Sequence, residues 1–387
     1  MDDCEVLVVG GGPAGSSCAR ALVQSGVDVC VIDKARFPRD KVCGGWITPQ
    51  TVASLELDLD AYGRGRTLQP ITSFAVGLVG GRVAKVDYGR AVSHAIRRCE
   101  FDDYLLRRAG ARLRLAEPVE AIERVAGGWC VNGALRTRLL VGAGGHGCPV
   151  ARALGRGAAT SGEPIAGQEV EFAMTAPEAA RCSVPATEPL LLFCRDLRGY
   201  GWCVRKGDFV NVGLGRIGGQ GLGRQVRAFW EELERAGAVA GPPRTPFKGH
   251  AYLSYPASRR AEVADGALLI GDAAGLADPQ SGEGIRTAIE SGLLAAAAIV
   301  AARGEFGAAH LESYAAGLAT RFGPRVAAAA EPGTGSLATL RNAIGRWLLT
   351  QPLFVRSVVL DRWFLHSARP ALAAPAPGPR LATAYSA

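Results

Sequence analysis

The stretch that decides the fold is EVLVVGGGPAG, residues 5–15. Residues 5–9 are a largely apolar, β-branched run, which is typical of a buried parallel strand. The loop that follows has the spacing Gly10-x-Gly12-x-x-Gly15. Its glycines permit a tight turn, a close approach of the backbone to phosphate, and close packing of a helix on the strand. The stretch therefore predicts a dinucleotide-binding loop, in which the N-terminus of the following helix holds a pyrophosphate.

A helix and a second strand complete this unit. Small residues favour a helix over 16–24, and residues 27–33 form a second apolar run. Asp33 ends that run about 20 residues beyond the loop, where a carboxylate can accept a hydrogen bond from an adenosine ribose. The alternative is a glycine-rich turn without a ligand, which is rarely accompanied by all of these parts in order. The residues predicted here to bind the cofactor are Gly10, Gly12, Pro13, Ala14, Gly15, Asp33 and Lys34.

A second glycine-rich segment narrows the choice among dinucleotide ligands. The run 266–270 predicts a buried strand ending in Gly271-Asp272, and a turn at 282–284 opens a long helix. A carboxylate after a buried strand can bind ribityl hydroxyls, and the positive end of a helix favours negative charge on a reduced flavin. The alternative is a strand–turn–helix junction with Asp272 as an N-cap. Together with the first loop, the segment predicts FAD, bound here by Gly271, Asp272, Pro279, Gly282, Glu283, Gly284 and Ile285.

Length and composition fit an enzyme of two domains. The 387 residues exceed what one hydrophobic core usually organises. The net charge of +8 comes mostly from scattered arginines, so no nucleic-acid partner is expected. Ten cysteines without a CxxC pair and five scattered histidines predict no metal site and a reduced, cytoplasmic protein. No targeting segment is expected at the start, and the longest apolar stretch, 291–302, is too short to span a membrane.

Hydrophobic periodicity predicts an α/β fold with an inserted sheet. Residues 66–88 and 112–141 have the pattern of short strands, and 90–108 that of a helix. Residues 156–255 have the pattern of antiparallel strands with one helix near 226–236. The fold is therefore a discontinuous Rossmann-type FAD-binding domain with an inserted antiparallel β-sheet substrate domain and a C-terminal helical segment. The predicted ranges are 1–65, 86–155 and 256–333 for the FAD-binding domain, 66–85 and 156–255 for the substrate domain, 334–369 for the helical segment, and 370–387 for a flexible tail.

The Gly-x-Gly-x-x-Gly spacing recurs at Gly142 and at Gly213. No second strand ending in an acid follows Gly213, so that copy is interpreted as a coincidence. A proline interrupts the helix after Gly142 early, which disfavours a second dinucleotide site there. His146 lies in this loop and is a candidate proton donor, with a surface or capping group as the alternative interpretation.

These motifs together resemble the geranylgeranyl reductase family, within the aromatic-hydroxylase-like (group A) superfamily of FAD-dependent oxidoreductases. The resemblance spans roughly residues 5–290, in the order found in the family. It is carried by residues 10–15, 39–45 (RDKVCGG), 98–102 (RCEFD), 199–202 (GYGW), 211–215 (NVGLG) and 271–284.

The resemblance implies roles for residues outside the glycine loops. It puts Cys43 in a loop near the isoalloxazine, and Tyr200 and Trp202 in the substrate cavity facing the flavin. A buried structural thiol remains the alternative for Cys43, and sheet packing the alternative for the two aromatic residues. The predicted catalytic residues are Cys43, Tyr200, Trp202 and His146, and the further residues implied to bind FAD are Arg39, Lys41, Cys43, Gly44 and Arg98.

Three departures from the patterns of related families bear on the chemistry. Hydroxylase relatives carry Gly-Ala-Asp-Gly where this chain has Gly142-Ala-Gly-Gly, which argues against NADPH-driven hydroxylation. The reductase element Tyr-x-Trp-x-Phe-Pro-Lys is changed here to Tyr200-x-Trp202-x-Val-Arg-Lys, which bears on an isoprenoid substrate. The halogenase element Trp-x-Trp-x-Ile-Pro is not matched.

The leading hypothesis is a reductase or dehydrogenase that acts on C=C bonds of a hydrophobic, isoprenoid-like or polycyclic substrate through N5 of reduced FAD. NADPH, NADH or a protein donor would supply the electrons.

The apolar segment 347–365 fits a hydrophobic substrate, peripheral contact with anionic lipid, or a helix packed on the core. Other hypotheses are an FAD-dependent monooxygenase or halogenase that activates oxygen on an aromatic substrate, and a non-catalytic FAD-binding protein. The arginines around the apolar segment are Arg346, Arg356, Arg362 and Arg369.

Overall fold

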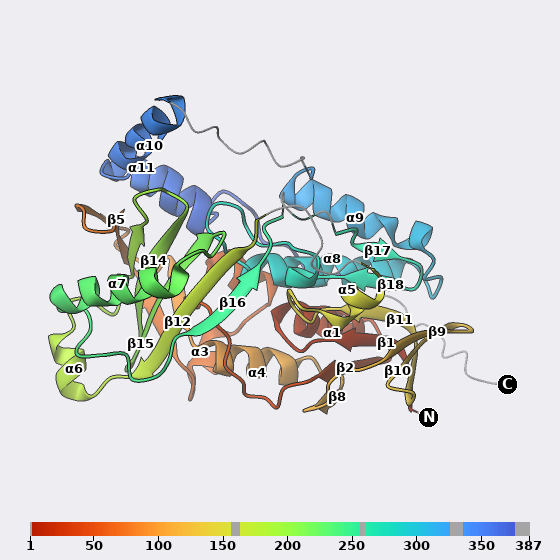
Figure 1. The fold of residues 1–387 in the computed structure, drawn as a ribbon. Coiled ribbons are helices and arrows are strands. Elements are labelled where there is room, and N and C mark those ends of the chain that lie inside the picture. The colour runs from red at the N-terminus through yellow and green to blue at the C-terminus, as the bar shows by residue number, and fades with distance from the viewer. Residues whose placement is uncertain (1, 156–162, 256–257, 259, 326–335, 376–387) are drawn as a thin grey trace.

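The structure is a computed structural model that describes residues 2–155, 163–255, 258, 260–325 and 336–375. The apolar run at the start of the chain forms β1 in the middle of a twisted sheet (Figure 1). In the described part of the chain this sheet has eight strands, and its path runs β17-β18-β11-β1-β2-β8. The bounds are β1 (Asp2–Val9), β2 (Val29–Asp33), β8 (Arg112–Leu115), β9 (Ile122–Val125), β10 (Gly128–Val131), β11 (Leu135–Gly142), β17 (Val263–Ala264) and β18 (Ala267–Leu269).

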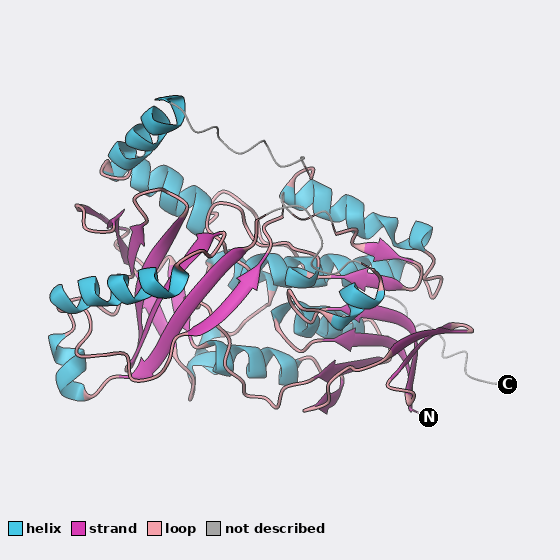
Figure 2. Ribbon diagram, in the orientation of Figure 1, coloured by secondary structure: helices cyan, strands magenta, loops and turns pink. Residues whose placement is uncertain are grey.

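Helices pack against this sheet, whose central strands β1, β2, β11 and β18 pair in parallel (Figure 2). Helix α1 packs directly on α8, because Gly292 lets the two backbones approach each other. A Cβ atom at Gly292 would lie 2.5 Å from the carbonyl oxygen of Ala14. The helical elements are α1 (Pro13–Gln24), α2 (Pro49–Ser54), α3 (Leu59–Gly63), α4 (Arg98–Arg108), α5 (Pro149–Ala153), the 3-10 helix η1 (Gly271–Ala273), α8 (Ile285–Ala301) and α9 (Ala308–Phe322).

The second sheet has seven strands in the order β16-β12-β15-β14-β13-β5-β6 within the described residues. All of its neighbouring strands are antiparallel except β13 and β5, which are parallel. Two further helices, α6 (Ala176–Arg181) and α7 (Leu222–Arg235), belong to this part. The strands are β5 (Ser73–Leu78), β6 (Val83–Asp87), β12 (Ile165–Ala173), β13 (Leu190–Phe193), β14 (Gly199–Lys206), β15 (Phe209–Ile217) and β16 (Lys248–Tyr252).

Successive side chains of β14 enter two different apolar clusters, because neighbouring residues of a strand point to opposite faces of the sheet. Trp202 and Val204 belong to a cluster that includes Phe364 near the C-terminus. Cys203 belongs to a second cluster that includes Phe229 of α7. Helix α7 therefore covers one face of the sheet and the C-terminal helical segment covers the other (Figure 1).

A third, three-stranded sheet has the order β3-β7-β4, with β3 (Trp46–Ile47), β4 (Leu68–Ile71) and β7 (Ser93–Ile96). The single helix expected over 90–108 is therefore wrong, because its first part forms β7 and α4 begins only at Arg98. Strand β7 pairs with a strand on each side, and these tertiary contacts override the local pattern. The domain ranges stay a prediction.

The C-terminal helical segment consists of α10 (Ser336–Leu348), α11 (Pro352–Phe354) and the π-helix η2 (Val355–Phe364). The predicted fold class, an α/β FAD-binding fold with an inserted sheet and C-terminal helices, is confirmed. Of the predicted tail, residues 370–375 form no helix or strand, and 376–387 lie outside the described residues, as do 334–335 of the helical segment. No helix among the described residues is both long and apolar enough to cross a bilayer.

Candidate active site

A cavity of about 810 Å³ lies between the two large sheets. Its walls come from the loop after β1, the ends of β2 and β11, and strands β14 and β16. In α/β proteins, ligands bind outside the carboxyl ends of parallel strands, which is where this cavity opens. Its volume lies in the range of pockets that hold cofactors and substrates.

The loop after β1 forms a cradle that side chains would fill. Gly10 has a φ of +117°, and a Cβ there would lie 2.4 Å from the carbonyl oxygen of Ala143. A Cβ at Gly15 would lie 1.9 Å from the carbonyl oxygen of Gly10. Gly12 is the N-cap of α1, and no side chain of the described residues caps that helix. The open N-terminus and close backbone fit a pyrophosphate, so the residues present fit FAD.

Asp33 is held at the edge of the same cavity by the backbone. Its Oδ2 accepts a hydrogen bond from Gly11 N–H at 2.7 Å, and its Oδ1 accepts one from Ala35 N–H at 2.8 Å. Asp33 and Lys34 both line the cavity. The carboxylate keeps lone pairs that can accept further hydrogen bonds, and the bond to a ribose stays a prediction.

Two arginines share one buried carboxylate beside the glycine loop. Arg98 donates two hydrogen bonds of 2.8 Å to Asp102, and Arg39 Nη1 lies 3.1 Å from the same side chain. Burial by itself would lower the pKa of Arg98, but the charge of Asp102 raises that pKa above its ordinary value. Arg39 also lies near the N-terminus of α1, with Nη2 3.4 Å from the position of a Cβ on Gly12. Positive charge therefore gathers where the pyrophosphate would bind.

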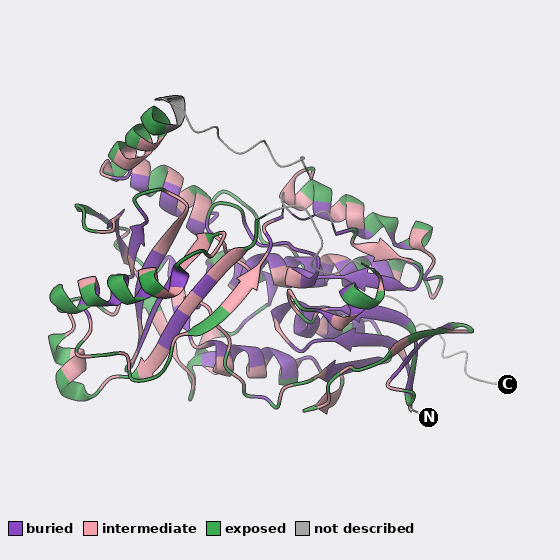
Figure 3. Cartoon of the chain, in the orientation of Figure 1, coloured by how far each residue is buried: buried purple, intermediate pink, exposed green. Residues whose placement is uncertain are grey.

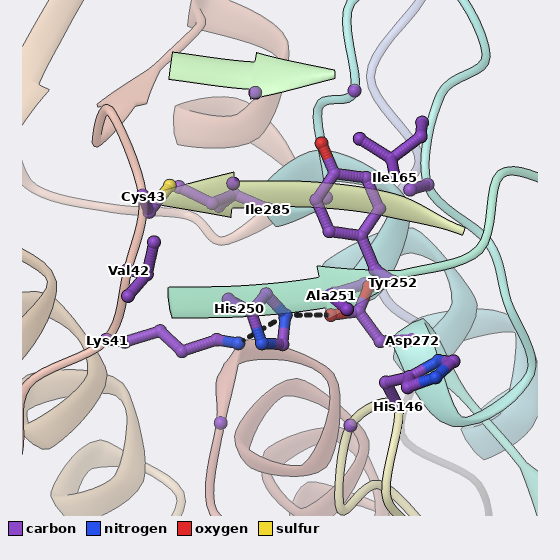
Figure 4. A pocket seen from close by; sticks show the side chains of 18 of the residues that line it. Lys41, Val42, Cys43, His146, Ile165, His250, Ala251, Tyr252, Asp272 and Ile285 are labelled. Carbon is purple, nitrogen blue, oxygen red and sulfur yellow. Dashed lines mark hydrogen bonds and ion pairs between the residues drawn. The ribbon is translucent and has the colours of Figure 1, made fainter. Parts of the chain in front are cut away.

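Lys41, His250 and Asp272 form a polar cluster on the cavity wall (Figure 4). Lys41 Nζ lies 2.7 Å from His250 Nε2, and the same histidine nitrogen lies 3.3 Å from Asp272 Oδ2. Burial lowers the pKa of Lys41 to about 8. Burial opposes ionisation of Asp272, but the hydrogen bond to His250 and the charge of Lys41 outweigh it and hold the pKa below its ordinary value. Lys41 can therefore exchange its proton near neutral pH.

The turn before α8 is tied to the C-terminal segment. Asp278 Oδ1 accepts hydrogen bonds from Gln280 N–H and Ser281 N–H, which shapes the turn around Gly282. Glu283 Oε2 lies 3.3 Å from Arg286 Nε and 3.2 Å from His366 Nε2. Burial opposes ionisation of Glu283, but the charge of Arg286 and the contact with His366 hold its pKa below the ordinary value. The carboxylate therefore serves at least to fix the C-terminal segment at the cofactor helix.

The far end of the cavity is aromatic. The Phe364 ring lies 5.3 Å from the Tyr200 ring and 5.9 Å from the Trp46 ring, measured between centroids. Tyr200 Oη donates a hydrogen bond of 2.6 Å to the carbonyl oxygen of Ser281. Trp202 lines the cavity and also covers Gly213, where a Cβ would lie 2.2 Å from its ring. The aromatic residues thus pack the sheet and line the cavity at once.

Buried charges support the loop that carries Cys43. Glu169 Oε2 accepts a hydrogen bond of 2.7 Å from Cys43 N–H and one of 3.2 Å from Asn211 Nδ2. Lys206 Nζ, fully buried, donates to Glu171 Oε2 at 2.7 Å. Burial raises the pKa of Glu169 to about 7, whereas Glu171 stays easier to ionise because Lys206 and Arg97 offset its burial. This network fixes the Cys43 loop against β12.

Cys43 and His146 line the cavity from two different loops (Figure 4). Cys43 is half-buried. His146 Nδ1 is buried and has no hydrogen-bond partner among the described residues. Burial, and next the charge of Arg260, lower the pKa of His146, so its imidazole is neutral at neutral pH. Their positions allow contact with a bound ligand, and their catalytic roles stay predictions.

The cavity brings together nearly all of the residues singled out in the sequence. Gly15 and Gly271 do not line it, since they act in packing: a Cβ at Gly271 would lie 3.0 Å from the Cβ of Ala14. The histidine and tyrosine of β16, His250 and Tyr252, were missed because they belong to no motif. Trp46 was missed as well. Gln280, Ser281 and Phe364 lie in segments that the sequence singled out, but they were not predicted as individual site residues. The predicted residues that do line it are Gly10, Gly12, Pro13, Ala14, Asp33, Lys34, Arg39, Lys41, Cys43, Gly44, Arg98, His146, Tyr200, Trp202, Asp272, Pro279, Gly282, Glu283, Gly284 and Ile285.

Comparisons with known proteins support FAD binding by this chain. Residues 3–58 match the FAD binding domain family model. The menaquinone reductase of Mycobacterium tuberculosis strain H37Rv is 32% identical over 329 residues, which cover 76% of each chain. The chloroplastic geranylgeranyl diphosphate reductase of Oryza sativa subsp. japonica is 30% identical over 327 residues, covering 76% of this chain and 66% of the rice protein.

Among solved structures, a geranylgeranyl bacteriochlorophyll reductase-like protein from Thermoplasma acidophilum has the same fold. The TM-score is 0.70 at 21% identity, over 91% of this chain and 88% of that one. Flavin-dependent halogenases share the fold as well. The fold and the glycine cradle define an FAD-dependent oxidoreductase. The chain belongs to the geranylgeranyl reductase family of these enzymes.

Proposed function

We propose that this enzyme reduces a C=C bond of a hydrophobic substrate that carries an isoprenoid chain. The observation that carries the proposal is one continuous cavity with a glycine cradle at one end and the rings of Trp46, Tyr200 and Phe364 at the other. The names of the relatives, menaquinone reductase and geranylgeranyl diphosphate reductase, support this substrate class. FAD, once bound and reduced, would supply the hydride.

The residues of this chain orient the substrate and control protons. The aromatic end excludes water and holds an apolar chain, whose own surface offers no hydrogen bonds. The second hydrogen added to the double bond arrives as a proton, and two sources face the cavity. The Lys41 ammonium, 2.7 Å from His250 Nε2, can give up its proton near neutral pH because burial lowers its pKa to about 8. His146 can donate only after its ring has taken up a proton from solvent, because burial favours the neutral imidazole. Cys43 lines the same cavity, on the segment of the chain between Lys41 and Trp46.

We infer further that NADPH or NADH reduces the flavin, with a protein donor as the other source of electrons, and that the enzyme works in the cytoplasm. The loop at Gly144 has no acid, so the nicotinamide nucleotide would need contacts other than those of the hydroxylases. Arg152, which lines the cavity, offers positive charge for the nucleotide's phosphates.

Flavin reoxidation tests the proposal. The purified holoenzyme is reduced under anaerobic conditions with NADPH, NADH or dithionite and is then mixed with the hydroquinone form of a quinone that bears an isoprenoid side chain, so that only the C=C bonds of the chain can take up electrons. The expected result is reoxidation at a rate that rises with hydroquinone concentration, and a slower reaction with the same hydroquinone after its side chain has been saturated. Equal rates for both hydroquinones, or reoxidation by oxygen alone with incorporation of oxygen into the substrate, would overturn it. The latter result indicates a monooxygenase.

Matched variants assign the proton source. Cys43→Ser, His146→Gln and His250→Gln are compared for flavin content and for the rate of reoxidation by the hydroquinone. The variant that lacks the proton donor should react about a hundredfold more slowly and keep its flavin content, since general acid catalysis contributes a factor of that size. A variant that loses flavin instead has a binding role.

A further inference from the structure

Exposed apolar side chains gather on the C-terminal helices. Within the described residues, six large apolar side chains are well exposed, and four of them lie between residues 340 and 353. They are Leu340 (57% exposed), Ile344 (48%), Trp347 (60%) and Leu353 (83%). Exposed large apolar residues gathered on one helix mark an interaction site more often than scattered ones do.

Three of these residues share one face of α10. Leu340, Ile344 and Trp347 have the spacing i, i+4, i+7, which puts them in one stripe on a helix. The opposite side holds α10 to the protein: a Cβ at Gly345 would lie 2.7 Å from Leu197 Cδ1, and Leu349 just after the helix is buried. The helix is therefore fixed from one side and presents its apolar stripe to the outside, as the exposed colouring of α10 in Figure 3 also shows.

Positive charge surrounds the stripe. Arg341 and Arg356 are exposed, and Arg346 is half-buried. The only acid between residues 336 and 369 is Asp361, whose Oδ1 accepts a hydrogen bond of 2.8 Å from Tyr88 Oη. An apolar helix face with tryptophan and leucine, flanked by arginines, is the pattern of a helix that lies in the interface of an anionic membrane.

This surface lies beside the aromatic end of the cavity. Leu197, against which Gly345 packs, lines the cavity, and so does Phe364 at the end of η2. The helices α11 and η2 connect the exposed Leu353 to Phe364 without a break. The apolar stripe therefore lies next to the aromatic end of the cavity, because α10 is joined to that end through Leu197 and through α11 and η2.

We propose that the α10–α11 face, formed by Leu340, Ile344, Trp347 and Leu353 with their flanking arginines, docks on the surface of an anionic lipid bilayer. Docking in this orientation brings the aromatic end of the cavity next to the lipid. The statement that a lipid substrate enters from that side rests on the proposed function, whereas the docking itself does not.

A second copy of the chain fits this face less well than a membrane does. A symmetric dimer would bring the same surface of both copies together, and with it Arg341 and Arg356 of one copy against those of the other. No acid of residues 336–369 is available to pair with them, since Asp361 is engaged with Tyr88. Four side chains on α10 and α11 also form a smaller patch than stable dimers bury.

Vesicle binding by the full-length holoenzyme tests the proposal. The protein is sedimented with vesicles of phosphatidylcholine alone and of phosphatidylcholine mixed with phosphatidylglycerol. The wild type is expected to bind the mixed vesicles, with a blue shift of its tryptophan fluorescence. The double variant Trp347→Ser/Leu353→Ser loses at least about tenfold in binding, because two large apolar side chains no longer enter the lipid. The double variant Arg341→Gln/Arg356→Gln loses about tenfold on mixed vesicles only.

The control variant Arg227→Gln/Arg235→Gln removes two exposed arginines from α7, on the other face of the second sheet. It should bind the mixed vesicles like the wild type, and all variants should keep their FAD. Absence of vesicle binding by the wild type, or equal loss in the α7 variant, overturns the proposal. A dimer in analytical ultracentrifugation that dissociates in the Trp347→Ser/Leu353→Ser variant also overturns it and assigns the face to a second copy. None of these readouts depends on the substrate, so they separate this proposal from the reductase activity.

Discussion

The two ends of the cavity are built in different ways. At the glycine end, backbone groups of consecutive residues form the binding surface, and Gly10, Gly12 and Gly15 act by having no side chain. At the aromatic end, side chains from segments far apart in the chain meet, as Trp46, Tyr200 and Phe364 do. The first end recognises a ligand that many proteins share, whereas the second is free to change with the substrate.

This difference has an energetic counterpart. A backbone cradle tolerates no added atom, because the carbonyl groups around it cannot move without breaking the strand and helix that hold them. An aromatic wall is made of many separate contacts, each of which contributes a modest part. Changes at the glycine end should therefore weaken cofactor binding strongly, and changes at the aromatic end should alter substrate affinity by degrees.

The largest effect is expected for Gly15→Ala. The new Cβ would lie 1.9 Å from the carbonyl oxygen of Gly10, so α1 must move away from β1. A displacement that costs about 3 kcal/mol lowers FAD affinity about a hundredfold. Equilibrium dialysis of the apoprotein with FAD measures it. Gly147→Ala is the matched control from the same cavity, since a Cβ there has no neighbour within 4 Å. Equal FAD affinity in both variants would contradict the claim that the glycine loop after β1 binds FAD.

The second prediction concerns the network behind the Cys43 loop. The folded state raises the pKa of Glu169 from 4.5 to about 7, so it disfavours the charged carboxylate. The stability that this group contributes is therefore lost as the pH rises from about 4.5 to about 7, by about 3 kcal/mol in total.

Urea unfolding between these pH values measures that loss. Glu169→Gln should remove it, since an amide does not titrate yet still accepts the hydrogen bond from Cys43 N–H. Glu231→Gln, which changes an exposed carboxylate on α7, serves as the control. A Glu169→Gln variant with the pH dependence of the wild type would contradict the assignment to Glu169.

The third prediction concerns Phe364→Leu, which tests whether the aromatic end of the cavity can change without affecting the glycine end. The variant keeps an apolar side chain but removes the ring contacts with Trp46 and Tyr200, which are worth about 1 kcal/mol beyond area burial. We expect KM for the isoprenoid quinone to rise about fivefold with FAD affinity unchanged. Phe306→Leu, which replaces a buried ring that does not line the cavity, should leave KM as it is. Loss of FAD in Phe364→Leu would show that the two ends are not independent.

The smallest effect is expected for Tyr200→Phe. It removes the hydroxyl that donates to the carbonyl oxygen of Ser281 and keeps the ring. The free energy of unfolding should fall by about 1 kcal/mol, measured by urea unfolding, with little change in turnover. A turnover that falls a hundredfold would instead make Tyr200 a catalytic residue.

The glycine end could be predicted from the sequence because it is local. The spacing from Gly10 to Gly15, the strand ending in Asp33 and the segment from Gly271 to Gly284 each carry their signal within a few residues. The fold class and the cofactor follow from these segments. The resemblance to a family added Arg39, Arg98, Tyr200 and Trp202, all of which line the cavity.

The remaining features depend on tertiary contacts that no local pattern encodes. His250 sits on a strand without a motif, and only the sheet topology brings it 2.7 Å from Lys41. The contacts of His366 with Glu283 and Arg286 join residues about 80 positions apart, so Glu283 could be predicted as a cofactor residue but not as an anchor for the C-terminal segment. Strand β7 was missed for the same reason, since its two partners are distant in sequence.

The most direct test of the central claim is the product that the reduced holoenzyme forms from a polyprenyl-bearing quinone under anaerobic conditions, analysed by mass spectrometry. The expected product carries two added hydrogens at a C=C bond of the isoprenoid chain. The Gly15→Ala variant, assayed without added FAD, is expected to form no product. An isoprenoid chain that stays unsaturated at every position, or a product that requires and contains oxygen, would contradict it.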